Sequence, residues 1–147
     1  MAFTERGRTV KFYTIGYGGR KPKDFLEILK QKGIKAVVDV RLLPDRAYLV
    51  TYAKAKVEDK GIQGLLARAG IEYFSLVELG NKFLGQEDWR ERYRELLDRD
   101  GALLTEPLFQ IPTPFCLMCS EKSSAKCHRR EISEYLAKKG HEVEHIE

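Results

Sequence analysis

The stretch from Pro114 to Glu131 limits the fold most, because it contains all three cysteines and passes from an apolar run through a polar loop into a helical pattern. The run 115–118 is too short for a helix and predicts a buried strand that stops at Cys119. Apolar residues at helical spacing follow the loop, and Ser123 or Ser124 is expected to cap that helix. A strand followed by such a helix is the repeating unit of an α/β fold.

This placement puts Cys127, His128 and Arg129 in the first turn of the predicted helix. Unpaired backbone N–H groups and the helix dipole favour negative charge there, so a thiol should ionise more easily. The fork of Arg129 suits phosphate, sulfate or carboxylate, and His128 could move a proton near neutral pH. The stretch can therefore hold an anion or a nucleophile.

The same alternation of strands and helices runs through the rest of the chain. Strands are predicted at 10–15, 36–40, 71–77 and 143–146, and helices at 22–33, 65–69 and 86–99. Consecutive strand–helix–strand units cross over right-handed into a parallel sheet. We expect one three-layer α/β sandwich domain over residues 10–147, with a mostly parallel sheet of four to five strands, and a flexible tail at residues 1–9.

Composition bounds the partners and the compartment. The chain has no run of 18 apolar residues and a polar beginning, so we expect a cytoplasmic protein with no membrane partner. Three cysteines within twelve residues do not make a secreted disulfide framework and suggest reduced thiols, a metal site or a redox pair. Residues 1–60 hold 14 Lys and Arg against 7 Asp and Glu, which favours an anionic partner, although a solvated lysine-rich surface is the more ordinary interpretation. No cofactor is indicated, and the sequence does not address oligomeric state.

In open parallel sheets, ligands gather at the carboxyl ends of strands, where this chain places several polar residues. Asp39 and Arg41 end the second predicted strand. A partly buried Asp39 needs a partner, so it is either a site residue or half of an internal ion pair. Gly18 and Gly19 follow the first strand and could let an anion approach the backbone. A plain tight turn is the simpler interpretation, since the Lys-Ser/Thr of a P-loop and the third glycine of a dinucleotide fingerprint are absent.

Several short motifs occur in order along the chain. They are Thr14-Ile15-Gly16, Asp39-Val40-Arg41 with Pro44, Gly70-Ile71-x-Tyr73, Leu79-Gly80, and Cys119-x-Glu121 followed by Cys127-His128-Arg129. Together they resemble the domain-of-unknown-function family 488 over residues 12–146. The resemblance implies a small cytoplasmic α/β domain without an established reaction, and it places the family's pattern on Asp39, Arg41, Cys119, Glu121, Cys127, His128 and Arg129. Members often carry His-Ser where this chain has Tyr17-Gly18, which weakens the expectation of a shared reaction if that histidine takes part in it.

The first functional hypothesis is an enzyme that acts on a phosphate-bearing or nucleotide-like small molecule. Cys127 or Cys119 would be the nucleophile and His128 the acid or base, while Arg129 and Arg41 would hold the anion, with Gly18 and Gly19 as further anion-binding candidates. Glu121 could orient His128 or bind a ribose hydroxyl, and Asp39 completes the catalytic candidates. Neither Cys119 nor Cys127 starts the Cys-x5-Arg spacing of a phosphatase loop.

Three alternatives stay open. A non-catalytic nucleic-acid or nucleotide-binding module could use residues 42–60, where Tyr48 and Tyr52 lie among basic residues that include Arg46 and Lys54. A zinc site could use Cys116, Cys119, Cys127 and His128, but residues three apart on a strand point to opposite faces, so no metal is expected unless the strand bends. A Cys119–Cys127 redox pair needs Cα atoms within roughly 7 Å. Cys116 is expected to pack as a small core residue.

Overall fold

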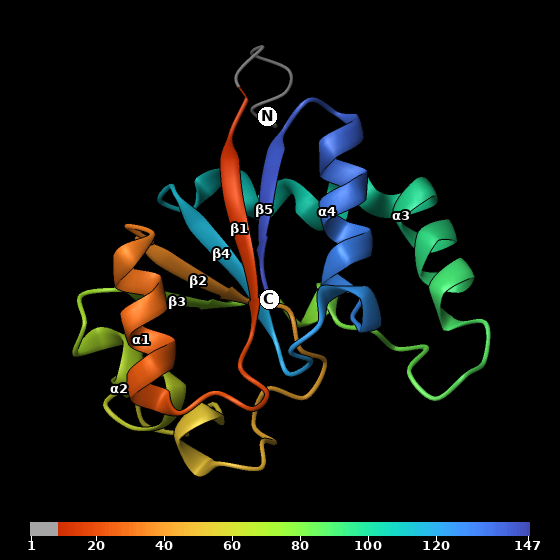
Figure 1. The fold of residues 1–147 in the computed structure, drawn as a ribbon. Helices are drawn as coiled ribbons and strands as arrows, with labels where there is room; N and C mark the ends of the chain where they lie inside the picture. The colour runs from red at the N-terminus through yellow and green to blue at the C-terminus, as the bar shows by residue number, and fades with distance from the viewer. Residues whose placement is uncertain (1–8) are drawn as a thin grey trace.

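A computed structural model describes residues 9–147, which fold around a five-stranded parallel sheet (Figure 1). The strands are β1 (Lys11–Gly16), β2 (Ala36–Asp39), β3 (Glu72–Ser75), β4 (Phe115–Cys119) and β5 (Glu142–Ile146). They lie in the order β3-β2-β4-β1-β5, and every neighbouring pair is parallel. The predicted α/β sandwich is confirmed. Of the predicted tail, all but Thr9 lies outside the described residues.

Helices cover both faces of the sheet (Figure 1). α1 (Pro22–Gln31) and α2 (Gly61–Ala67) pack on one face, and α3 (Trp89–Thr105) and α4 (Arg129–Lys138) pack on the other. Side chains of β4 alternate between the two apolar layers, as a buried strand requires: Cys116 packs toward α1 and α2, whereas Cys119 packs toward α3 and α4. Within residues 9–147, no helix combines the length and apolar character needed to cross a membrane.

Helix boundaries show where the sequence analysis was wrong in detail. Ser123 and Ser124 make no side-chain cap: residues Ser124–Lys126 form a short 3-10 turn, and α4 begins only at Arg129. Cys127 and His128 therefore precede the helix. The helix predicted at 86–99 begins at Trp89 and continues to Thr105, passing Gly101, where an added Cβ would lie 2.5 Å from the Tyr135 ring of α4. Glycine normally destabilises a helix interior, but at Gly101 it allows α3 to pack closely on α4.

The carboxyl ends of β1, β2 and β4 meet at one edge of the sheet. Gly16 pairs with Cys119 and Asp39 pairs with Met118 in the strand register. Beyond the strands, the backbone N–H of Tyr17 donates to the Cys119 carbonyl at 3.0 Å, and that of Val40 donates to Met118 at 3.0 Å. These bonds hold the loops after the three strands together and define the floor of a cavity.

Candidate functional site

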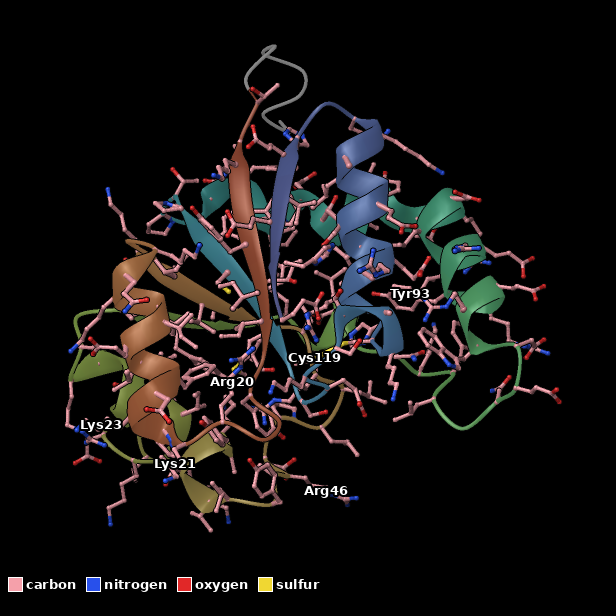
Figure 2. All side chains as sticks on the ribbon, in the orientation of Figure 1. Arg20, Lys21, Lys23, Arg46, Tyr93 and Cys119 are labelled. Carbon is pink, nitrogen blue, oxygen red and sulfur yellow. A yellow bond between two sulfur atoms is a disulfide. The ribbon has the colours of Figure 1, made fainter. Side chains whose placement is uncertain are left out.

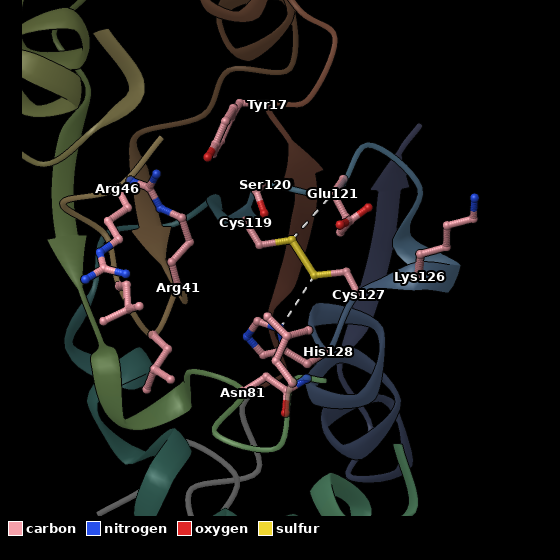
Figure 3. Close-up of a pocket in the computed structure, with 13 residues that line it drawn as sticks. Tyr17, Arg41, Arg46, Asn81, Cys119, Ser120, Glu121, Lys126, Cys127 and His128 are labelled. Carbon is pink, nitrogen blue, oxygen red and sulfur yellow. Dashed lines mark hydrogen bonds between the residues drawn. A yellow bond between two sulfur atoms is a disulfide. The ribbon is translucent and has the colours of Figure 1, made fainter. Parts of the chain in front are cut away.

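A cavity of about 220 Å³ opens beyond the carboxyl ends of these strands (Figure 3). Its polar and sulfur-bearing lining comes from four loops and comprises Tyr17, Arg41, Arg46, Asn81, Cys119, Ser120, Glu121, Lys126, Cys127 and His128. Three leucines, Leu42, Leu43 and Leu84, supply the apolar part. Figure 2 shows Cys119 in the middle of the molecule and Arg46 beyond the strand ends. The cavity occupies the place that a parallel sheet predicts for a ligand.

Arg41 is fixed by a buried ion pair with Asp39. Its Nε and Nη2 donate to the two carboxylate oxygens at 2.9 and 2.7 Å, and the hydroxyl of Tyr73 donates to the same carboxylate at 2.5 Å. Burial alone would lower the pKa of Arg41, but Asp39 outweighs it and raises that pKa, so the guanidinium stays charged. Asp39 is fully buried and does not line the cavity. The internal ion pair is thus the arrangement found at this position.

One nitrogen of Arg41 remains for a ligand. The side chain is only 6% exposed, and its Nη1 has no well-formed hydrogen bond in the described part of the chain. The Tyr17 side chain is the polar neighbour that, after Asp39, raises the pKa of Arg41. The Tyr17 ring lies beside the guanidinium, with its centroid 5.2 Å from Cζ. The Tyr17 ring stacks on the buried Tyr52 ring, with 4.6 Å between the centroids, which fixes Tyr17 in place. Asp39 and Tyr17 therefore both hold the Arg41 guanidinium. A buried N–H without an acceptor is costly, so this nitrogen is a candidate donor to a bound anion.

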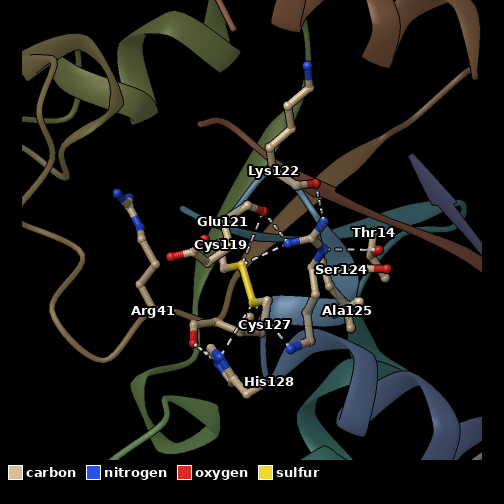
Figure 4. Close-up of a disulfide and its surroundings, with 12 residues drawn as sticks. Thr14, Arg41, Cys119, Glu121, Lys122, Ser124, Ala125, Cys127 and His128 are labelled. Carbon is tan, nitrogen blue, oxygen red and sulfur yellow. Dashed lines mark hydrogen bonds between the residues drawn. A yellow bond between two sulfur atoms is a disulfide. The ribbon is translucent and has the colours of Figure 1, made fainter. Parts of the chain in front are cut away.

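Cys119 and Cys127 lie at the centre of the site, joined as a disulfide, with Cα atoms 7.5 Å apart (Figure 4). Cys119 ends β4, and Cys127 lies two residues before the start of α4. The Cys127 sulfur accepts the backbone N–H of Arg129 at 3.4 Å, a free donor at the helix N-terminus. The Cys127 sulfur therefore lies at the N-terminal end of α4, where it accepts one backbone N–H.

His128 is buried, and one hydrogen bond fixes its tautomer. Its Nε2 lies 2.8 Å from the carbonyl oxygen of Val40, which can only accept, so Nε2 carries the proton. The unprotonated Nδ1 then faces the Cys127 sulfur at 3.6 Å. Burial lowers the pKa of His128 to about 4, and the charge of Arg129 acts in the same direction. At pH 7 the ring is a neutral acceptor rather than a group that titrates near neutrality.

Arg129 is completely buried and does not line the cavity. Its Nη1 donates to the Cys119 sulfur at 3.0 Å and to the Glu121 carbonyl at 2.5 Å. Its Nη2 donates to the Lys122 carbonyl at 3.0 Å and its Nε to the Thr14 hydroxyl at 3.2 Å. Burial lowers the pKa of Arg129 to about 10. All of these partners belong to the protein and the side chain lies outside the cavity lining, so the predicted clamp of Arg129 on a substrate anion is not observed.

Residues 21–136 match the family described as "Domain of unknown function DUF488". The match runs from the beginning of α1 into α4 and includes the whole cysteine stretch. The chain belongs to the DUF488 family. The resemblance carried by the short motifs is confirmed, while no curated protein and no solved structure matches the chain significantly. Because the family's function is unknown, the activity of this DUF488 chain has to be argued from its site.

The DUF488 site brings together some of the predicted residues and not others. Arg41, Cys119, Glu121, Cys127 and His128 line the cavity, whereas Asp39 and Arg129 lie behind it. Gly18 and Gly19 are not part of the lining.

The glycine loop after β1 packs against the protein's own backbone. The N–H of Gly18 donates to the Ser120 carbonyl at 2.9 Å, and a Cβ on Gly16 would lie 1.6 Å from the Glu121 oxygen. The loop is therefore a close-packed turn, and its glycines admit the loop after β4 rather than a ligand.

The four residues of the zinc alternative do not come together in the structure. Cys116 lies in the other apolar layer, where burial raises the pKa of its thiol. Among residues 9–147, no three His, Cys, Asp or Glu side chains are placed to hold a metal ion. Cys119 and Cys127, the pair of the redox alternative, are in direct contact, with a Cα separation just beyond the 7 Å that was expected.

Five polar lining residues were not among the predicted catalytic or anion-binding residues: Tyr17, Arg46, Asn81, Ser120 and Lys126, of which Arg46 was named only for the nucleic-acid alternative. Tyr17 follows β1 directly, so its position after a strand was a usable signal. The basic loop at 42–60 divides: Tyr52 is buried with its hydroxyl bonded to the Arg20 carbonyl at 2.7 Å, whereas Tyr48 is 63% exposed. Only Tyr48 of these two tyrosines is open to a partner.

Proposed function

We propose that this DUF488 chain is an enzyme that binds a small phosphate-bearing or nucleotide-like anion in the cavity and acts on it with a cysteine thiol. The observation that carries the proposal is the Nη1 of Arg41. It is buried and charged, it has no well-formed hydrogen bond among residues 9–147, and the Arg41 side chain lines the same cavity as Cys119, Cys127 and His128. A charged donor held in this way recognises an oxyanion better than a mobile surface lysine does.

The other lining residues refine the ligand. Arg46 and Lys126 are exposed cations on opposite sides of the cysteine pair (Figure 3) and would attract an anion from solvent. The leucines at 42, 43 and 84 offer apolar surface to a ring or chain. A cavity of about 220 Å³ is small for a ligand site, which favours a mononucleotide or a smaller phosphate ester over a longer chain. The Glu121 carboxylate could accept a hydrogen bond from a hydroxyl of such a ligand.

Binding can be tested without knowing the reaction. We expect inorganic phosphate and AMP, titrated by calorimetry into reduced protein, to bind saturably. Arg41→Met combined with Asp39→Asn removes the donor without leaving a buried carboxylate unpaired, and it should weaken binding by about 10-fold or more, the usual worth of a hydrogen bond to a charged group. Arg99→Met combined with Asp100→Asn makes the same two changes at an exposed ion pair of α3 and should leave affinity unchanged. No binding by the wild type, or equal binding by both variants, would refute the anion site.

Turnover needs a separate measurement. Phosphate monoesters and nucleotides incubated with reduced protein can be followed by phosphorus NMR, with Cys119→Ser and Cys127→Ser as variants. A thiol enzyme should lose turnover in at least one of them while keeping phosphate affinity. Turnover that survives in both variants would reject the thiol as the reacting group.

A second candidate is a nucleic-acid or nucleotide-binding module without catalysis. The ring of the exposed Tyr48 stacks on the ring of Tyr17, with 5.9 Å between the ring centroids. Tyr17 and Arg46 both line the cavity. Aromatic side chains can stack on bases and basic side chains can bind phosphates, so together they suit single-stranded DNA or RNA. Arg46→Ala and Lys54→Ala should then weaken oligonucleotide binding and reduce its salt dependence. A wild type with no oligonucleotide affinity would exclude this candidate.

A further inference from the structure

Arg129 is a buried cation without a carboxylate partner. It is 0% exposed, and no Asp or Glu oxygen in the described chain lies within 4 Å of its nitrogens. Arg41, nearly as buried, has Asp39. Buried charges are normally paired, because removing a lone charge from water is costly. The carbonyls of Glu121 and Lys122 and the Thr14 hydroxyl spread the charge of Arg129. Glu147 favours the charged form of Arg129 only from beyond 4 Å, so no carboxylate among residues 9–147 is in contact with the guanidinium.

The ionisable group in contact with this guanidinium is a cysteine. Nη1 of Arg129 lies 3.0 Å from the Cys119 sulfur, which becomes a thiolate or a thiol when the disulfide is reduced. A thiolate there would supply the missing negative charge in a water-poor position, where the attraction between opposite charges is strong. Cys119 also lines the cavity, so the same sulfur is presented to a ligand.

Cys127 has different neighbours. Its sulfur lies 3.6 Å from the unprotonated Nδ1 of His128 and accepts one backbone N–H, but no side-chain cation among residues 9–147 is bonded to it. A neutral imidazole acceptor suits a thiol that keeps its proton. The two cysteines of the pair are therefore not equivalent once the bond between them is broken.

We infer that Cys119 is the nucleophilic thiolate of the site, that Arg129 is its buried counter-ion, and that Cys127 is the partner thiol that blocks Cys119 when the two are oxidised to a disulfide. The assignment rests on the proposed function for its substrate, and it names the reacting atom. Arg129 is in this view a positioning residue that acts through Cys119 and does not touch the anion.

The chemistry of the two states balances. Dithiothreitol transfers two electrons to the Cys119–Cys127 bond and becomes a cyclic disulfide. It loses two protons: one goes to Cys127, which becomes a thiol, and the other goes to solvent, while Cys119 remains a thiolate. Reoxidation by an added disulfide, such as oxidised dithiothreitol, reverses each of these changes and removes the nucleophile.

The test is the pH dependence of iodoacetamide alkylation, read by peptide mass spectrometry on reduced protein. In Cys127→Ser we expect a Cys119 midpoint at least about one pH unit below the free-thiol pKa of about 8.5. In Cys119→Ser, the Cys127 midpoint should lie above that of Cys119. Midpoints rather than rates are compared, since the two sulfurs differ in access. A lower midpoint at Cys127 would overturn the assignment, and so would a Cys119 midpoint at 8.5 or above.

Arg129→Met adds a second test. It should raise the Cys119 midpoint by more than about one unit, whereas Arg130→Met, a matched loss of charge at the adjacent residue whose side chain contacts Ser124, should not. Equal effects of the two variants would overturn the role of Arg129. If Arg129→Met fails to fold, the two serine variants still decide. Because phosphate binding is measured independently through Arg41, failure of the cysteine assignment would leave the anion site standing, and the reverse also holds.

Discussion

His128 should make the protein less stable in mild acid. Its pKa is lowered to about 4 in the folded state, against 6.5 for the free side chain, so the unfolded chain binds the proton more readily between these values. The stabilisation is complete above pH 6.5 and is lost as the pH falls from about 6.5 to about 4. At 1.36 kcal/mol per pKa unit, the His128 contribution should fall by about 2 kcal/mol between pH 7 and pH 5, and by about 3 kcal/mol in the limit.

A variant isolates this contribution from that of the other titrating groups. His128→Gln keeps an N–H that can reach the Val40 carbonyl but does not titrate. Urea unfolding can be followed by the fluorescence of Trp89, the single tryptophan, at pH 5, 6 and 7 with the same excess of reductant. We expect wild type to lose about 2 kcal/mol more than His128→Gln over this range. The exposed control Arg99→Gln should follow wild type.

Parallel curves for wild type and His128→Gln would refute the reasoning, because they would mean that His128 titrates alike in the folded and unfolded states. A wild type that gains stability in acid relative to the variant would mean that the imidazolium is favoured inside the protein. In that case the proton assigned to Nε2 alone, and the neutral acceptor facing Cys127, would both be wrong.

Two further predictions concern how the site is built. Asp39→Ala leaves the Arg41 guanidinium buried without its carboxylate and should lower the free energy of unfolding in urea by about 3–5 kcal/mol. Tyr73→Phe keeps the ion pair and should lower it by about 1–2 kcal/mol. Equal losses in the two variants would contradict the ion-pair argument. Gly16→Ala places a Cβ 1.6 Å from the backbone carbonyl oxygen of Glu121 and should lower the melting temperature far more than Gly33→Ala. At Gly33 the added Cβ has open space, and the only cost is the φ of +68°, about 1 kcal/mol. A mild effect at Gly16 would mean that the loops after β1 and β4 can separate.

The fold could be predicted because it follows from patterns within short segments. The buried run at 115–118, the proline that begins α1 and the glycine that ends it are local signals, and the parallel order of the sheet limits where ligands can bind. Cys116 was expected to be a core residue because alternation along a strand separates it from Cys119, and the two lie in different layers.

The details of the site depend on contacts between distant segments. The tautomer of His128 is set by the carbonyl of Val40, 88 residues earlier, and no local pattern contains that bond. Gly18 and Gly19 look like a ligand loop in sequence, yet the space beside that loop is filled by residues 120–122. Arg129 was expected to face an anion because it was placed in the first turn of a helix, but its guanidinium is buried and donates to the carbonyls of Glu121 and Lys122.

The two buried arginines show how one site can separate binding from reactivity. Arg41 has a carboxylate of its own, so it enters the cavity as half of a neutral pair with one donor left, and it can receive an anion and release it again. Arg129 has no carboxylate within 4 Å among residues 9–147, so its charge acts most directly on the sulfur beside it. Exchanging these surroundings would spoil both roles: a substrate anion held by an unpaired buried cation would be hard to release, and a thiolate beside a neutralised arginine would be protonated. The position of Asp39 next to Arg41, rather than Arg129, is therefore what gives the two arginines different roles.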